Sequence, residues 1–183
     1  MGLLEKFPLE TFQEVVIMDG TMRGKAQLYG EDVTLDGTLY MEKTYGHKFP
    51  KTWFWVQANH FNIPGASLSM SGGHVPTIKF RPFGFFVLLY TTTKNYRFAT
   101  YDLSRIQMMH DANRTRFLVK KWFKTLEVIV TQHDPTELVG PTDGGRMSLP
   151  VYESISAHVK VTLKRGNTTL LTTESPLTGF EYM

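Results

Sequence analysis

The segment 36–61 carries the residues best suited to chemistry, because aromatic and polar side chains are interleaved along two predicted strands. Side chains two residues apart in a strand point to the same face. One face of the second strand therefore presents two indoles in line with two amides, from Trp53, Trp55, Gln57 and Asn59. Aromatic walls with a few convergent polar groups are typical of a ligand pocket. The alternative is structural: the indoles fill the end of a barrel while the amides bond the backbone.

A carboxyl group lies on the preceding predicted strand, where Tyr40, Glu42 and Thr44 share a face. Because Glu42 and Lys43 are adjacent, they point to opposite faces, and one of them is expected to point inwards. A carboxyl held in an apolar pocket has a raised pKa and can act as a general acid. Glu42 is therefore a candidate catalytic residue, with an ordinary exposed Glu–Lys pair as the alternative.

Other kinds of site are not favoured by the sequence. Cysteine is absent, and the six histidines show no HxH, HxxxH or HExxH spacing, so no metal site is expected. No GxSxG, Walker or GxGxxG motif occurs, and we expect no cofactor. A net charge of +3 is too small to indicate a nucleic-acid partner.

The sequence also bears on the compartment. No run of about 18 apolar residues occurs, so no membrane span is expected. Glu5 and Lys6 come too early for the apolar core of a signal peptide, and the expected location is the cytoplasm.

Strands are predicted almost throughout the chain, and they must position these side chains. Residues 52–60, 125–131 and 156–164 alternate apolar and polar side chains, which is typical of half-buried antiparallel strands. Turns are expected at 19–20, 30–32, 36–37, 71–73 and 165–167, where glycine accompanies Asp, Asn or Ser. The region 133–150, rich in Gly and Pro, is expected to be a loop that could act as a lid. The pattern predicts an all-β antiparallel barrel or strongly bent sandwich, as one domain over 1–183.

The predicted strand 83–90 differs from the others because it is apolar on both faces. Such a strand is covered on both sides. Either another element packs over its second face, or that face lines a cavity for an apolar ligand. A face left uncovered would favour a homodimer or a separately encoded N-terminal lobe as partner; the loop 133–150 is the alternative cover.

The segment 40–61 resembles the signature of the tocopherol cyclase-like family, which reads roughly Y-x-E-K-N-W-G-x-x-F-P-x-x-W-x-W-x-Q-x-N-x-F. The matching residues are Tyr40, Glu42, Lys43, Gly46, Phe49, Pro50, Trp53, Trp55, Gln57, Asn59 and Phe61. Thr44 and Tyr45 stand where the family usually has Asn-Trp. Segments 84–87, 96–101 and 175–181 are similar to bacterial members.

The resemblance implies a lipocalin- or calycin-like β-barrel, similar to the C-terminal lobe of a two-lobed protein. Plant and cyanobacterial members close the chromanol ring of vitamin E from a prenylated quinol. The implied ligand is therefore an apolar prenylated or isoprenoid molecule, and the implied reaction is an intramolecular cyclisation. Glu42 would be the acid, Tyr40, Trp53 and Trp55 the aromatic faces, and Gln57 and Asn59 the groups that hold the quinol hydroxyls. A hydrophobic-ligand-binding module without chemistry and a structural lobe that needs a partner chain are the alternatives.

Overall fold

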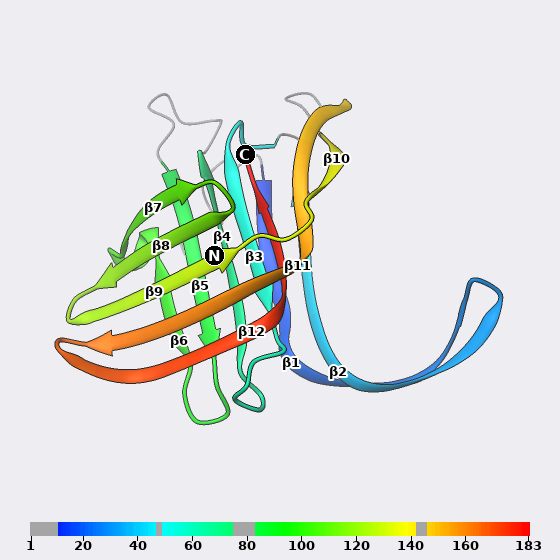
Figure 1. The fold of residues 1–183 in the computed structure, drawn as a ribbon, viewed down its shortest axis with the longest axis horizontal. Helices are drawn as coiled ribbons and strands as arrows, with labels where there is room; N and C mark the ends of the chain where they lie inside the picture. Colours follow the sequence, from blue (N-terminus) through cyan, green and yellow to red (C-terminus); the bar gives the residue numbers. More distant parts are fainter. Residues whose placement is uncertain (1–10, 47–48, 75–82, 142–145) are drawn as a thin grey trace.

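Antiparallel strands make up almost all of the fold (Figure 1). The computed structural model describes residues 11–46, 49–74, 83–141 and 146–183. Its strands are β1 (Thr11–Leu28), β2 (Glu31–Gly46), β3 (Trp53–Ala58), β4 (Ser67–His74), β5 (Phe83–Tyr90), β6 (Tyr96–Ala99), β7 (Arg105–Asp111), β8 (Arg114–Lys121), β9 (Lys124–Thr131), β10 (Thr136–Pro141), β11 (Met147–Arg165) and β12 (Thr168–Tyr182). Within the described ranges, the only helical element is the 3-10 turn η2 (Thr100–Asp102). The prediction of an all-β antiparallel fold is confirmed.

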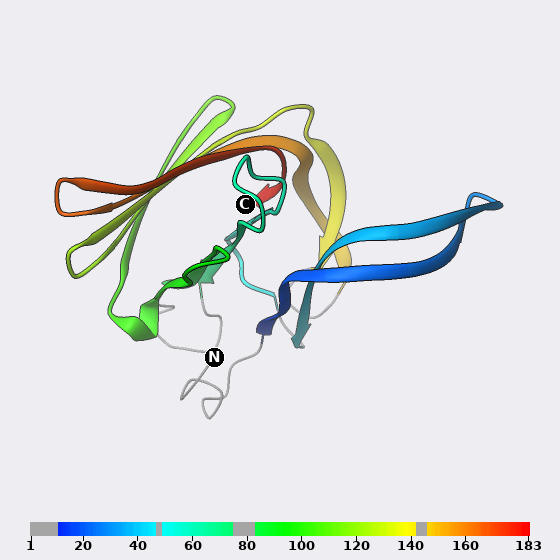
Figure 2. The ribbon, with the colours of Figure 1, turned by 90° about the horizontal axis from the view of Figure 1, so that it is seen from below.

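Ten of the strands form one sheet that curves back on itself into a nearly closed barrel (Figure 2). The order along the sheet is β6-β5-β4-β3-β12-β11-β9-β8-β7, and β10 pairs with β11. The curvature brings distant strands face to face: the rings of Phe54 on β3 and Phe117 on β8 lie 4.7 Å apart. The Tyr182 hydroxyl on β12 lies 2.7 Å from His110 Nε2 on β7.

The hydrophobic core fills the concave side of this sheet, where one side-chain row after another points inwards. Phe180, Val56, Met70, Val87 and Phe98 lie opposite one another on five consecutive strands, and all are buried. Burial of apolar surface on this scale is the main stabilising contribution to the fold. The expectation of a single domain over 1–183 stays a prediction.

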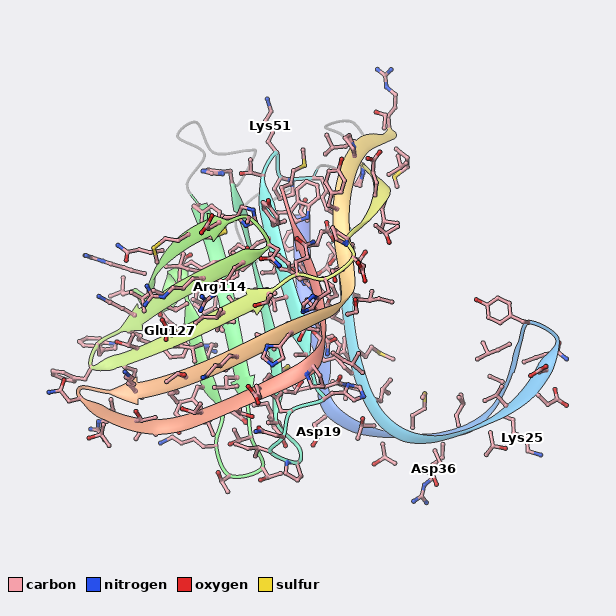
Figure 3. The ribbon with its side chains drawn as sticks, viewed as in Figure 1. Asp19, Lys25, Asp36, Lys51, Arg114 and Glu127 are labelled. Atoms are coloured by element: carbon pink, nitrogen blue, oxygen red, sulfur yellow. The ribbon has the colours of Figure 1, made fainter. Side chains whose placement is uncertain are left out.

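The first two strands form a separate two-stranded ribbon that leaves the body and extends away from it (Figures 1 and 2). The pairing of β1 with β2 shifts register between Val15 and Gly20, and such bulges bend a strand. Figure 3 shows Asp19 close to this bend, with Lys25 and Asp36 on the distal part. The proximal part lies against β4. The ribbon therefore has one half on the sheet and one half in solvent.

Three of the expected turns are wrong. Residues 19–20 and 36–37 lie inside β1 and β2, and 71–73 lie inside β4. At Gly72 the reason is close packing, because a Cβ there would lie 2.7 Å from the Phe54 ring and 2.8 Å from Phe85 Cβ. Glycine in this strand therefore marks a close approach of neighbours. The turns at 30–32 and 165–167 are confirmed, because β1 and β11 end beside them.

The region 133–150 is not the loop that its Gly and Pro content predicted. It contains β10 and the start of β11, which pair from Thr136↔Glu153 to Pro141↔Met147; residues 142–145 lie outside the described ranges. Proline has no N–H to donate to a neighbouring strand, so it is tolerated at a sheet edge. Pro150 is at such an edge, because it pairs with β10 on one side and β12 begins to pair with β11 only at Tyr152.

The second face of strand 83–90 lines a cavity. Phe85, Val87 and Leu89 point into the core, whereas Phe86 and Leu88 on the opposite face line that cavity. The second face therefore borders a cavity; that this cavity holds an apolar ligand stays a prediction.

We expect Phe117→Ala to lower the free energy of unfolding by about 3–5 kcal/mol, because it removes a fully buried ring from the contact between the two sides of the curved sheet. Urea denaturation measures this loss. Phe123→Ala is the matched control, because Phe123 is 78% exposed and its removal should change stability by no more than about 0.5 kcal/mol. Equal effects of the two substitutions would contradict the packing described here.

Candidate functional site

A cavity of about 1110 Å³ lies between the sheet, the proximal ribbon and β10. Its apolar wall includes Phe49, Trp53, Trp55, Phe86 and Leu88, and its polar groups include Glu42, Ser71 and Glu181. Ligand sites typically span roughly 300–1,000 Å³ and combine apolar walls with a few polar groups. This cavity has the composition of such a site and is slightly larger than the typical range.

One row of side chains runs across the sheet and forms the floor of the cavity. Glu153, Glu181, Trp55, Ser71 and Phe86 lie directly opposite one another on β11, β12, β3, β4 and β5. Directly opposed residues of antiparallel strands share a face, and all five line the cavity. The floor therefore has carboxyl groups at one end and aromatic rings at its centre and far end.

Trp53 and Trp55 share a face of β3, as predicted from the alternation, and both line the cavity. The Trp53 Nε1–H donates to Glu181 Oε1. The Trp55 ring lies over Gly179, where a Cβ would come within 2.7 Å of the indole edge. Trp55 Nε1 is buried and has no hydrogen-bond partner among the described residues.

Glu42 faces the sheet from the ribbon and is held by two donors. The Tyr40 hydroxyl donates to Glu42 Oε2 at 2.6 Å, and Gln13 Nε2 donates to the same oxygen at 3.1 Å. The Tyr40 oxygen also lies 2.9 Å from Ser69 Oγ on β4, which ties the ribbon to the sheet. Burial, followed by the hydrogen bond to Glu42, raises the pKa of the Tyr40 phenol well above its usual value, so the phenol keeps its proton.

Lys43 settles the question of which residue of the Glu–Lys pair points inwards. Its Nζ lies 2.7 Å from Glu14 Oε2 across the ribbon, and both side chains are largely exposed. Glu42 is therefore the inward residue of the two, and Lys43 forms the exposed pair with a different carboxylate.

The structure brings Glu42, Trp53 and Trp55 to one cavity but places the other candidates elsewhere. Tyr40 does not line the cavity, but its hydroxyl donates a hydrogen bond to Glu42, which does. Gln57 and Asn59 are not among the lining residues. Gln57 Nε2 is buried without a hydrogen-bond partner among the described residues, and Asn59 Oδ1 lies 3.0 Å from His60 Nδ1.

Glu181 and Glu153 are among the cavity residues that sequence reasoning missed. Burial raises the pKa of the Glu181 carboxyl and the charge of Glu153 adds to this, whereas the Trp53 hydrogen bond lowers it. The sequence held a signal for Glu181, because Gly179 and Glu181 share one face of β12 while Phe180 between them is buried on the other face. The pairing of β12 with β3, which puts Glu181 beside Trp55, could not be read from spacing.

Two further properties concern the described part of the chain. No three His, Asp or Glu side chains there come together in a way that could hold a metal ion. Within the same residues, no helix has the length and apolar character needed to cross a membrane.

Comparison with known proteins places the chain in a family. The model of the tocopherol cyclase-like family matches residues 1–182. The chain belongs to the tocopherol cyclase-like family. Tocopherol cyclase, chloroplastic, of Zea mays is 35% identical over 78 residues, which is 39% of this chain and 16% of that protein. The matched part is therefore a small fraction of the plant protein. No solved structure gives a significant match.

We expect Gly179→Ala to displace the Trp55 indole and to lower stability by about 1–3 kcal/mol, because its Cβ would overlap the ring edge. Near-ultraviolet circular dichroism and urea denaturation measure the two effects. Gly37→Ala is the matched control, because nothing lies within 4 Å of a Cβ built there. An unchanged indole signal in Gly179→Ala would contradict this account of how the floor is packed.

Proposed function

We propose that this member of the tocopherol cyclase-like family binds an apolar prenylated or isoprenoid molecule in the cavity. The observation that carries the proposal is the cavity itself, about 1110 Å³ with Trp53 and Trp55 in its wall. The polar groups among the apolar walls, Glu42, Ser71 and Glu181, support it, because a few polar groups orient a ligand in such a pocket. The Zea mays relative, named a tocopherol cyclase, is consistent with a prenylated ring as the ligand.

The chemistry that fits the cavity is intramolecular cyclisation of such a ligand. Ring closure needs a group that gives a proton to an alkene, a group that takes a proton from a phenol, and aromatic faces near the cation. Glu42 is our first candidate for proton transfer, because the ribbon holds its carboxyl group at the cavity with two hydrogen bonds. A binding module that uses the same cavity without chemistry is the alternative.

The direct test is mass spectrometry of apolar molecules that co-purify with the protein. Recovery of a prenylated or isoprenoid molecule from the wild-type protein, and less of it from Trp55→Ala, would support the proposal. Recovery of equal amounts from both proteins would place the binding elsewhere.

We expect geranylgeranyl hydroquinone to bind to the wild-type protein and Trp53→Ala or Trp55→Ala to weaken that binding by about 1–3 kcal/mol, as for other buried aromatic anchors. Equilibrium dialysis measures the affinity without relying on tryptophan emission. Trp122→Ala is the matched control, because Trp122 is 81% exposed and lies outside the cavity lining. If both cavity variants bind as the wild type does, the indoles are not the binding surface.

A partner chain is a second proposal, carried by the distal half of the ribbon. Its paired residues put Met22, Ala26, Leu28, Val33 and Leu35 on one face. Leu28 is 51% exposed. The opposite face carries charged groups, including the pair Arg23–Asp36 at 3.4 Å. An isolated two-stranded ribbon is marginally stable in water, so we propose that a second copy of the chain, or a separate N-terminal lobe, covers the apolar face.

We expect light scattering at micromolar concentration to give twice the monomer mass, and Leu28→Ser with Leu35→Ser to give the monomer. The reason is that both substitutions put hydroxyl groups on the apolar face of the ribbon. Lys25→Ser on the opposite face is the control. A wild-type protein that remains monomeric as its concentration rises would leave a separate lobe as the only covering partner.

A further inference from the structure

Glu181 occupies a position in the cavity that the proposed function does not yet use. It lies at the acidic end of the side-chain row that forms the floor, between Glu153 on β11 and Trp55 on β3. Trp53 Nε1 donates to its Oε1, which fixes the carboxyl group against an indole edge. The side chain is half-buried, and it borders the same cavity as Glu42 from a different element.

The two cavity carboxyl groups have different environments. Glu42 Oε2 receives hydrogen bonds from Tyr40 and Gln13, an arrangement in which the carboxylate acts as an acceptor. Glu181 receives one hydrogen bond, from Trp53, and lies directly opposite another acidic residue, Glu153. A site that places two carboxyl groups in contrasting environments divides the acid and base roles between them.

We propose that Glu181 is the proton donor of the cavity and that Glu42 is the acceptor. This assignment rests on the proposed cyclisation and replaces the sequence-based assignment of Glu42 as the acid. Burial of the Glu181 carboxyl, which raises its pKa, agrees with the geometry.

The reaction balances without an oxidant or a metal. The Glu181 O–H bond breaks and its proton forms a C–H bond with the less substituted alkene carbon, using the π electrons. The phenol oxygen then bonds to the resulting tertiary cation, beside Trp53, Trp55 and Phe86, and the phenolic proton passes to the Glu42 carboxylate. Exchange with water returns both carboxyl groups to their starting states.

The test uses geranylgeranyl hydroquinone as the probe and measures binding and turnover separately. Glu181→Gln keeps an oxygen for Trp53 to bond but has no acidic proton, so turnover should fall by about 100-fold or more with binding retained. Glu174→Gln is the matched control, because Glu174 lies on the same strand, is exposed and is not part of the cavity lining. It should bind and turn over the probe as the wild type does.

Each other result has a definite meaning. Full turnover by Glu181→Gln, with Glu42→Gln inactive, would overturn the inference and restore Glu42 as the acid. A wild-type protein that binds the probe but forms no cyclised product would overturn the inference and leave the binding proposal standing. Failure of the wild type to bind the probe would overturn the proposed function and the inference together.

A stability measurement gives a readout that does not depend on turnover. A raised folded pKa means that Glu181 stabilises the fold below its unfolded pKa and loses this contribution as pH rises through the folded value. Glu181→Gln should therefore match the wild type at about pH 4 and have a higher unfolding midpoint at about pH 8. The same difference at both pH values would overturn the proton-donor assignment.

The remaining titratable or charged groups at the cavity also contribute to any pH dependence. They are Glu14, Lys43, His74, Arg97 and Tyr101. All of them are present in both proteins, so the difference between Glu181→Gln and the wild type isolates the group at position 181.

If Glu181→Gln does not fold, Glu181→Asp is the second variant: it keeps an acidic proton but shortens its reach, so bound probe should turn over more slowly. Full turnover by Glu181→Asp would overturn the inference.

Discussion

The pairing of β12 with β3 joins the two halves of the sheet, and the site depends on it. Five residue pairs, from Thr178↔Ala58 to Tyr182↔Phe54, connect the strands β3–β6 to the strands β7–β12. Successive pairs point to opposite faces. Phe180 and Val56 therefore enter the core, while Glu181 and Trp55 enter the cavity. Shifting this pairing by one residue would exchange the two sets.

The two faces of β3–β5 explain why the cavity lies outside the core. The concave face is closed by Phe117 and its neighbours from the other half of the sheet. Among the described residues, the opposite face is covered by the proximal ribbon, by β10 and by Phe49 and Pro50. These are narrow elements, and they leave a space between them. The Tyr40–Ser69 contact sets how closely the ribbon approaches, so the ribbon determines the size of the cavity as well as carrying Glu42.

Sequence reasoning identified the fold class and the cavity wall on β3 because both depend on local alternation. Trp53 and Trp55 share a face in any extended strand, and their positions followed directly. Residues 71–73 and 133–150 were misread because glycine and proline there serve packing and sheet edges. Gln57 lies on the expected face but is not among the residues that line the cavity. Glu181 was missed because its neighbours in space come from a strand more than a hundred residues earlier, and register is not visible in one sequence.

The distance along the chain between the cavity's two sides has a consequence for folding. Trp53 and Glu181 are separated by 128 residues, so their contact forms only after a very large loop closes, and such topologies fold slowly. During synthesis the edge of β3, with Phe54 and Val56 beside it, stays unpaired until β12 leaves the ribosome. An unpaired apolar edge is a template for aggregation. The fifteen-residue strand β12 thus both completes the cavity and protects the nascent chain.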